Sequence, residues 1–107
     1  MSLERLYLYG WAKLNSLPDE LQHFTALTAL WILEFHGIGA LPEWLGNLSS
    51  LQELYLNTCK NLMHLPTEHA MQRLTQLQKV YIVNCPKLKE NGKQLSKIQY
   101  FPDVHIY

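Results

Sequence analysis

Apolar side chains recur along this chain in one short pattern, in which two are three residues apart and a third follows two residues later. The pattern starts at residues 3, 27, 51, 77 and 101, so the successive offsets are 24, 24, 26 and 24 residues. In each copy the last two apolar positions alternate with one other residue, which is the period of a β-strand with one buried face. The pattern therefore predicts five short strands around these alternating positions, at residues 6–8, 30–32, 54–56, 80–82 and 104–106.

The apolar register continues beyond each predicted strand. The eighth position after each start is Trp11, Phe35, Cys59 or Cys85, and the eleventh is Leu14, Ile38, Leu62 or Leu88. Leu-Pro pairs at 17–18, 41–42 and 65–66 then turn the chain back, since proline suits the first turn of a helix. Residues 18–21, 42–45 and 67–74 are expected to form short helical segments with acidic residues near their starts. The fourth copy lacks Leu-Pro, so we expect its return loop, around residues 90–92, to be irregular.

A repeat of this length and pattern is a leucine-rich repeat. One such unit cannot bury its apolar face alone, but stacked units share a core and a parallel sheet. We therefore predict an α/β leucine-rich-repeat solenoid with a five-stranded parallel sheet on its concave side and short helical or 3₁₀ segments on its convex side. Residues 1–107 are expected to form a single domain, with units 3–26, 27–50, 51–76 and 77–100 and a terminal strand at 101–107.

The residue between the last two apolar positions of each strand must point away from the core. It bears a ring in all five copies: Tyr7, Trp31, Tyr55, Tyr81 and His105. Neighbouring strands lie about 4.8 Å apart, so these rings are expected to form a continuous stripe on the concave face. Aromatic side chains are favoured where proteins bind each other, and the stripe predicts a protein-binding surface. The alternative is that the rings suit strands and stack only as a scaffold.

Two further columns of residues flank this stripe. Tyr9, Leu33, Asn57 and Val83, with Tyr107, are expected to extend the binding surface. On the other side the column consists of Arg5, Ala29, Glu53, Lys79 and Asp103, which mixes both charges as the polar rim of an interface does.

Composition, charge and motifs argue against several other functions. Lys plus Arg equals Asp plus Glu at nine each, so no nucleic-acid or membrane partner is expected. No apolar run approaches the ~20 residues that cross a bilayer, and the first residues have no signal-peptide layout. No serine lies in a nucleophile-elbow sequence, and the acidic pairs fit helix starts, so we expect no enzyme.

Cys59 and Cys85 are too few to staple the fold with disulfides, and their shared repeat position points inward. We expect them to be reduced, buried and apolar in character, as in a cytoplasmic protein. The five histidines show no paired spacing that suggests zinc. No metal or other cofactor is therefore expected.

The string Leu-x-x-Leu-x-Leu-x-x-Cys-x-x-Leu-x-x-Leu-Pro at residues 51–66, repeated in part at 77–88, resembles the C-terminal repeats of plant intracellular nucleotide-binding leucine-rich-repeat disease-resistance proteins. Residues 97–107 are similar to the closing segment of that family, and the resemblance covers essentially the whole chain. Trp11 and Phe35 depart from it, because cysteine or asparagine is commoner there. The chain has no Gly-x-x-x-x-Gly-Lys-Ser/Thr loop, so it is not the nucleotide switch of such a receptor.

The resemblance implies a protein partner: a pathogen effector, a host protein, or the nucleotide-binding module of the same receptor. Two other interpretations stay open. One is a structural clamp or self-association scaffold, and the other is part of an extracellular leucine-rich-repeat receptor, because Asn47-Leu48-Ser49 is a glycosylation sequon. The first unit has no polar cap before Leu3, so we expect either further repeats before it or self-association through it.

Overall fold

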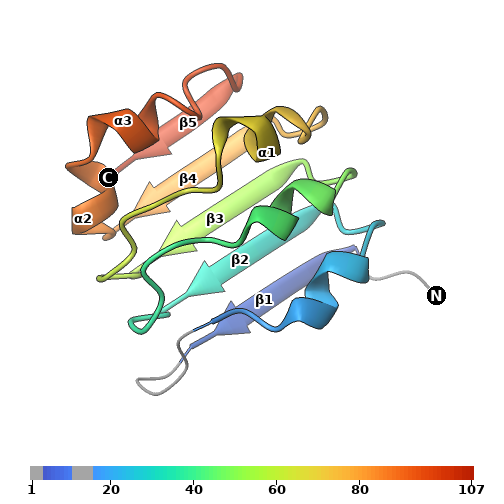
Figure 1. Cartoon of the computed structure of the whole chain (residues 1–107), viewed down its shortest axis with the longest axis horizontal. Coiled ribbons are helices and arrows are strands. Elements are labelled where there is room, and N and C mark those ends of the chain that lie inside the picture. The colour runs from blue at the N-terminus through green and yellow to red at the C-terminus, as the bar shows by residue number, and fades with distance from the viewer. Residues whose placement is uncertain (1–3, 11–15) are drawn as a thin grey trace.

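The computed structural model describes residues 4–10 and 16–107, and the structural statements below concern these residues. They form one five-stranded parallel sheet whose strands follow one another in chain order (Figure 1). The strands are β1 (Arg5–Tyr9), β2 (Ala29–Leu33), β3 (Glu53–Asn57), β4 (Lys79–Val83) and β5 (Asp103–Ile106). The expected leucine-rich-repeat architecture is therefore confirmed, while the expectations for Leu3, Trp11 and Leu14 lie outside the described residues.

Each strand begins two residues after the start of its repeated pattern. In the second, third and fourth copies the first leucine closes the turn before the strand. The backbone N–H groups of Leu27, Leu51 and Leu77 each donate to the carbonyl three residues earlier, at 3.0, 3.0 and 3.2 Å. Their side chains are buried, so the leucines count toward the core without belonging to the sheet.

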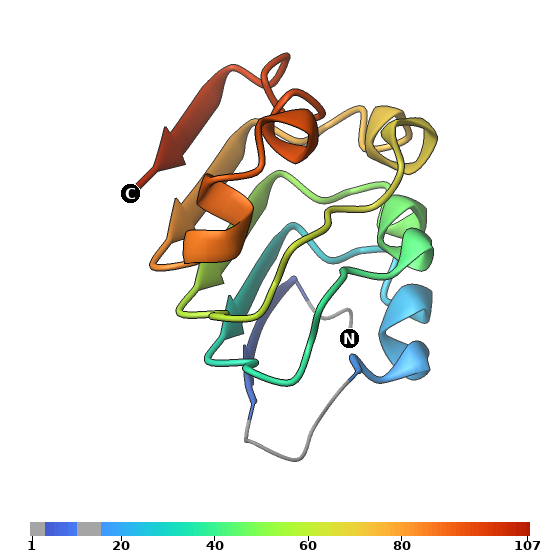
Figure 2. The ribbon, with the colours of Figure 1, turned by 60° about the vertical axis from the view of Figure 1, so that its left-hand side comes forward.

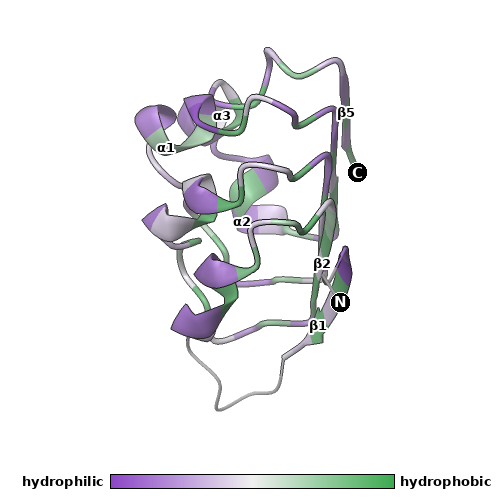
Figure 3. Cartoon of the chain, turned by 90° about the vertical axis from the view of Figure 1, so that its right-hand side faces the viewer, coloured by the Kyte–Doolittle hydropathy of each residue, from purple (hydrophilic) through white to green (hydrophobic). Residues whose placement is uncertain are grey.

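Short helical segments lie across the core from the sheet (Figure 3). The first two, η1 (Asp19–His23) and η2 (Glu43–Asn47), are 3₁₀ helices that follow the Leu-Pro pairs, and the third, α1 (Glu68–Gln72), is an α-helix. The Thr67 hydroxyl caps α1 by accepting a hydrogen bond from the backbone N–H of Ala70 at 3.3 Å. The expected helical return segments are thus confirmed.

The expectation of an irregular return loop in the fourth unit is wrong. This loop contains two short helices, α2 (Pro86–Lys89) and α3 (Gly92–Leu95). Pro86 begins α2, where its fixed φ suits the helix and an N–H is not needed. The Asn91 carbonyl accepts from the N–H groups of Gln94 and Leu95 at 3.0 and 3.1 Å, which starts α3. Helix formation here did not require the Leu-Pro signal.

A continuous apolar core fills the space between the sheet and the helical segments. Its members recur at equivalent positions in successive units, and they include Leu30, Leu54, Val80, Ile32, Leu56, Ile82, Phe35, Cys59, Cys85, Leu48, Leu62 and Leu88. Leu6 and Leu8 on β1, and Val104 and Ile106 on β5, are only partly buried. Within the described chain each of these outer strands pairs with one neighbour only, which leaves their apolar side chains less covered.

In the fourth unit, side chains make the hydrogen bonds that backbone groups make between earlier return segments, the stretches that lead from each strand back to the next. Between units two and three, the Leu41 N–H donates to the His64 carbonyl at 3.0 Å. One unit later, the Leu65 N–H donates to Oε1 of Gln94 at 2.9 Å, and the Asn91 amide donates to the Met63 carbonyl at 3.2 Å. The two amide side chains therefore satisfy backbone groups that a further Leu-Pro segment would otherwise pair with.

Candidate protein-binding surface

The sheet face that points away from the helical segments carries the predicted aromatic row, and we call it the open face. Tyr7, Trp31, Tyr55, Tyr81 and His105 occupy paired positions on the five strands. Successive ring centroids lie 4.2, 4.5, 5.1 and 4.6 Å apart, with interplanar angles of 20°, 7°, 38° and 30°. The sequence-predicted stripe is therefore one continuous stack of rings.

Stacking decides which part of each ring meets solvent. Rings that lie face to face cover one another, so the open face presents mainly ring edges and polar tips. Tyr7, at the β1 end of the row, is 53% exposed, whereas Trp31, Tyr55, Tyr81 and His105 are half-buried. At the β5 end the Tyr107 ring lies 6.0 Å from that of His105 and nearly parallel to it. Tyr107 thus extends the central stack, although the sequence placed it in the flanking column.

Charged side chains hold part of the stack in place. The Tyr55 hydroxyl donates to Oε1 of Glu53 at 3.0 Å, and the Lys79 ammonium lies 3.8 Å from the same oxygen. Burial and this hydrogen bond raise the pKa of Tyr55 to about 12. At β5 the His105 ring contacts the Asp103 carboxylate at 2.5 Å. The stack is therefore a fixed surface rather than a set of free side chains.

The flanking columns differ from each other. Tyr9 is 65% exposed, while Leu33, Asn57 and Val83 are half-buried beside the stack, so they widen the open face. On the other side Ala29 is fully buried and interrupts the expected polar rim. Its methyl group is too short to reach past its larger neighbours in the column. The rim is therefore formed by Arg5 at one end and by Glu53, Lys79 and Asp103 at the other.

A repeated turn after β2, β3 and β4 directs the next side chain into the core. Glu34, Thr58 and Asn84 all have positive φ, at 59°, 57° and 55°, although none is glycine. The N–H groups of Glu34 and Thr58 donate to the strand-end carbonyls of the following unit at 2.9 and 2.8 Å. This pairing offsets the cost of the left-handed backbone, which is about 1 kcal/mol for such residues.

Cys59 and Cys85 follow two of these turns, and both are free and buried, as expected. The Cys59 thiol lies 3.7 Å from the Ile32 carbonyl, and the Cys85 thiol lies 3.4 Å from the Val83 carbonyl, so each has a weak acceptor. A hydrogen bond with Cys85, together with burial, raises the pKa of the Cys59 thiol above its usual range. Cys59 is therefore a neutral core residue.

The described residues hold neither a metal cluster nor a membrane helix. Within residues 4–10 and 16–107, no group of three or more histidine, cysteine, aspartate or glutamate side chains is placed to bind a metal ion. In the same part of the chain, no helix is long and apolar enough to cross a bilayer.

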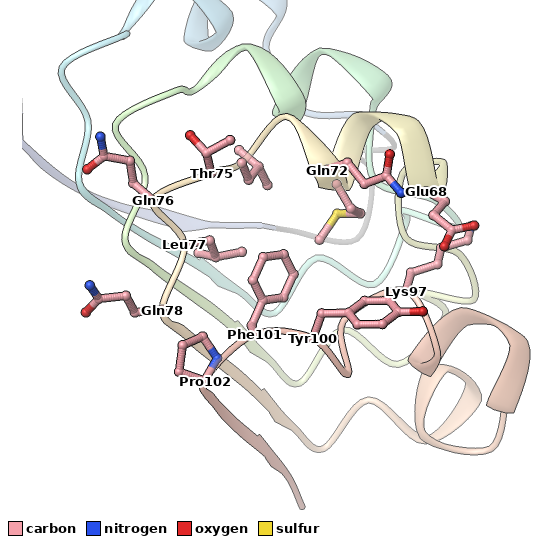
Figure 4. A pocket seen from close by; sticks show the side chains of 12 residues that line it. Glu68, Gln72, Thr75, Gln76, Leu77, Gln78, Lys97, Tyr100, Phe101 and Pro102 are labelled. Atoms are coloured by element: carbon pink, nitrogen blue, oxygen red, sulfur yellow. The ribbon is translucent and has the colours of Figure 1, made fainter.

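A second surface feature was not predicted from the sequence. A groove of about 720 Å³ lies between α1 with the loop that follows it and the segment that leads into β5 (Figure 4). The half-buried Phe101 and the exposed Pro102 contribute apolar surface above the buried Met71, Leu74 and Leu77, and Tyr100 at the rim is 73% exposed. The sequence feature related to this groove is the missing Leu-Pro pair of the fourth unit. In the earlier units that pair precedes the helix that stacks on its neighbour, so its loss leaves the position after α1 open.

Comparisons with known proteins agree with this fold. A family model described as R13L1/DRL21 LRRs matches residues 12–85. Disease resistance protein RML1A of Arabidopsis thaliana is 33% identical over 87 residues, which is 81% of this chain and 8% of the relative. Disease resistance proteins RPP4 and RPS4B of the same plant are 39% and 32% identical, and they align with 62% and 83% of this chain. The chain spans only 6% to 9% of the length of these relatives.

Proposed function

The chain belongs to the R13L1/DRL21 leucine-rich-repeat family, and from this membership we propose that it is the protein-binding recognition module of a plant immune receptor. In that receptor it senses a pathogen effector or a host target, restrains the receptor's nucleotide-binding module, or does both. The names of the relatives, all disease resistance proteins, support the immune setting. The observation that carries the proposal is the continuous ring stack on the open face.

The stack favours binding because its side chains are ordered before a partner arrives. Freezing a mobile side chain at an interface costs about 0.5–1.5 kcal/mol, and rings already fixed by their neighbours avoid most of this cost. Tyr7 and Tyr9 add exposed apolar area at one end of the surface. A partner that covers the stack therefore gains contact area with little loss of entropy.

The exposed chemistry suits a protein better than a nucleic acid. Proteins that bind single-stranded nucleic acid offer ring faces on which bases stack, together with excess positive charge. Here the ring faces lie against each other, and the chain carries as many acidic as basic residues. Ring edges, phenol hydroxyls and the Glu53–Lys79 pair are instead groups that meet polar and apolar atoms of another protein. We assign the chain no catalytic activity and no cofactor.

We place this module in the cytoplasm rather than outside the cell. Its two buried free thiols suit a reducing compartment. In the Asn47 sequon, the amide Nδ2 donates to Oε1 of Gln22 at 3.4 Å, and Oδ1 accepts from Arg73. A glycan on Nδ2 would separate η1 from η2 and α1. Leu48, the middle residue of the sequon, is fully buried, which hinders access by the glycosylation enzyme.

The test compares partner affinity between wild type and the Trp31→Ala and Tyr55→Ala variants. The chain is immobilised, plant leaf proteins that it retains are identified, and the affinity of each purified candidate is measured by calorimetry. Binding that weakens at least tenfold in both variants, with the fold intact by circular dichroism, supports the proposal. Phe24→Ala is the matched control, because it removes an exposed ring that follows η1 and lies neither on the open face nor in the groove.

Unchanged affinity in folded Trp31→Ala and Tyr55→Ala chains would contradict recognition through the stack. The scaffold alternative predicts a different result, namely that the chain associates with itself through the β1 end of the solenoid. Sedimentation measured over a wide concentration range separates the two, because a monomer at every concentration removes the self-association scaffold.

A further inference from the structure

The helical segments form a column that stops at α1. η1 packs against η2, and η2 packs against α1, so each unit stacks its return helix on that of the unit before. The helix α3 does not continue this column. Figure 1 and Figure 2 both show α3 set beside α1 rather than in line with η1, η2 and α1. The face of α1 that would meet the next helix in the column borders the groove instead.

One contact within the column shows how the start of one helix binds the start of the next. Glu43, the first residue of η2, accepts two hydrogen bonds from Thr67, the N-cap of α1. The Thr67 backbone N–H reaches Oε1 at 2.7 Å, and its hydroxyl reaches Oε2 at 2.6 Å. A carboxylate at the start of one helix thus holds the start of the next helix, where free N–H groups and the positive end of the helix dipole lie.

Glu68 holds the same place in α1 that Glu43 holds in η2. It is the first residue of its helix, it is exposed, and it lines the groove. Over the part of the chain that the structure describes, no hydrogen bond or ion pair involves its carboxylate. Lys97, the basic residue at the same end of the groove in Figure 4, donates instead to Oε1 of Gln94 at 2.9 Å.

The rest of the groove offers apolar contact to a helix. Phe101 is half-buried and Pro102 is exposed, and the buried Met71, Leu74 and Leu77 line the groove beneath this apolar surface. Figure 4 shows the Phe101 ring pointing from the segment before β5 toward the loop that carries Leu77. The exposed Tyr100 ring forms part of the rim that lies across the groove from α1. Apolar surface with a carboxylate at one end matches an amphipathic helix with its N-terminus at that end.

We propose that this groove binds a short amphipathic helix of a partner protein, and that Glu68 accepts hydrogen bonds from the backbone N–H and hydroxyl of a serine or threonine N-cap on that helix. The bound helix continues the column of η1, η2 and α1. Its apolar side chains cover Phe101 and Pro102, and the Tyr100 ring packs against it. This site is separate from the open face, and it does not depend on what the open face binds.

A peptide from this chain can serve as the probe, because residues 64–76 contain α1 and its N-cap Thr67, which binds Glu43. An acetylated and amidated peptide of this sequence is titrated into the ¹⁵N-labelled chain, and amide shifts are followed by NMR. We expect saturable shifts at Leu77, Gln78 and Phe101, with a Kd of about 1 mM because so short a helix is marginal in water. Glu68→Gln should raise this Kd about tenfold, since it replaces charged acceptors with neutral ones.

Matched variants separate the groove from other effects. A peptide with Thr67→Val keeps its shape, loses the hydroxyl and should bind about tenfold more weakly, whatever the effect of Glu68→Gln on folding. Tyr100→Ala should also weaken binding, whereas Glu20→Gln, the same charge removal at the exposed start of η1, should not. Tyr7→Ala should leave the peptide affinity unchanged, because that ring lies on the open face.

Three results would overturn the proposal. One is the absence of saturable shifts at the groove. Another is a peptide affinity that stays the same in both Glu68→Gln and the Thr67→Val peptide. The third is that groove amides shift with protein concentration when no peptide is present, because a second copy of the chain then occupies the groove. None of these results bears on partner binding at the open face.

Discussion

The Tyr55 hydroxyl and the Glu53 carboxylate are joined by a hydrogen bond of 3.0 Å across one face of β3. Burial and this bond raise the pKa of Tyr55 to about 12 from an ordinary value of 10.0, because both disfavour the phenolate. The bond therefore stabilises the fold fully below pH 10, and its contribution is lost as pH rises toward 12. We expect an ultraviolet titration of the six tyrosines to show one late ionisation that Tyr55→Phe removes.

Tyr81→Phe is the control for this titration. Tyr81 stacks next to Tyr55 and is also half-buried, but no hydrogen bond to its hydroxyl is found among residues 4–10 and 16–107. The late ionisation should therefore persist in Tyr81→Phe. If all six tyrosines ionised together near pH 10, Tyr55 would not be held by Glu53 as the structure shows. Tyr55→Phe should also lower the free energy of unfolding by about 1 kcal/mol at neutral pH.

Glu43→Gln tests the contact between η2 and α1. The hydrogen bonds from the hydroxyl and the N–H of Thr67 lower the pKa of Glu43 below its usual 4.5, because they favour the carboxylate. Glu43→Gln should lower the free energy of unfolding by about 1 kcal/mol at neutral pH, a small value because the carboxylate is exposed. Denaturation in urea measures this difference.

The pH dependence of this effect follows from the direction of the shift. A lowered pKa in the fold means that the Glu43 contribution is complete above pH 4.5 and disappears as pH falls through the lower folded pKa. The stability difference between wild type and Glu43→Gln should therefore shrink in acid. Glu20→Gln, which removes an exposed carboxylate from the start of η1, should change stability little at neutral pH. A Glu43→Gln difference that stays constant in acid would contradict the role of the charge.

The strand register and the ring stack could be predicted from the sequence because the repeat fixes them. Apolar residues on both sides of Tyr55 and Tyr81 must face the core, so both rings must face solvent. An offset of 26 residues then places them on neighbouring strands, which the pairing confirms. Periodicity is decisive here because a shift of one residue would move every side chain to the other face.

The fourth unit could not be predicted in the same way. Its packing depends on single contacts, such as Gln94 on the Leu65 N–H, that no periodic pattern encodes. α3 is displaced from the helical column and Tyr100 is exposed, and no periodic pattern encodes either placement. The burial of Ala29 was missed for a related reason, because its small side chain was placed in a polar column without regard to the larger neighbours beside it. Tertiary packing, not local propensity, decided these positions.

Gln94→Leu tests the hydrogen bond by which the fourth unit binds the backbone of the third. Oε1 of Gln94 accepts from the Leu65 N–H and from the Lys97 ammonium, both at 2.9 Å. Leucine leaves a partly buried N–H without an acceptor, which should lower the free energy of unfolding by about 1–3 kcal/mol. Gln94→Glu keeps an acceptor in place and should cost much less. Equal losses in the two variants, measured in urea, would show that the hydrogen bond from the Leu65 N–H is not what stabilises this contact.

Gly46→Ala tests how closely the helical column is packed. A Cβ added to Gly46 would lie 2.7 Å from the Ala70 carbonyl oxygen and 3.2 Å from its Cα. Both are backbone atoms that cannot rotate away, so η2 and α1 would have to separate, at a cost of about 1–3 kcal/mol. Thermal unfolding should show the loss as a fall in Tm of about 4–8 °C per kcal/mol.

Gly92→Ala provides the comparison for that substitution. Gly92 begins α3, its φ is not positive, and an added Cβ would meet nothing within 4 Å. Alanine should therefore leave stability unchanged or raise it by about 0.4–1 kcal/mol. Separation of η2 from α1 would also break the Glu43–Thr67 contact, so Gly46→Ala and Glu43→Gln together should cost less than the sum of the two. Strict additivity would mean that α1 keeps its place on η2 despite the added methyl group.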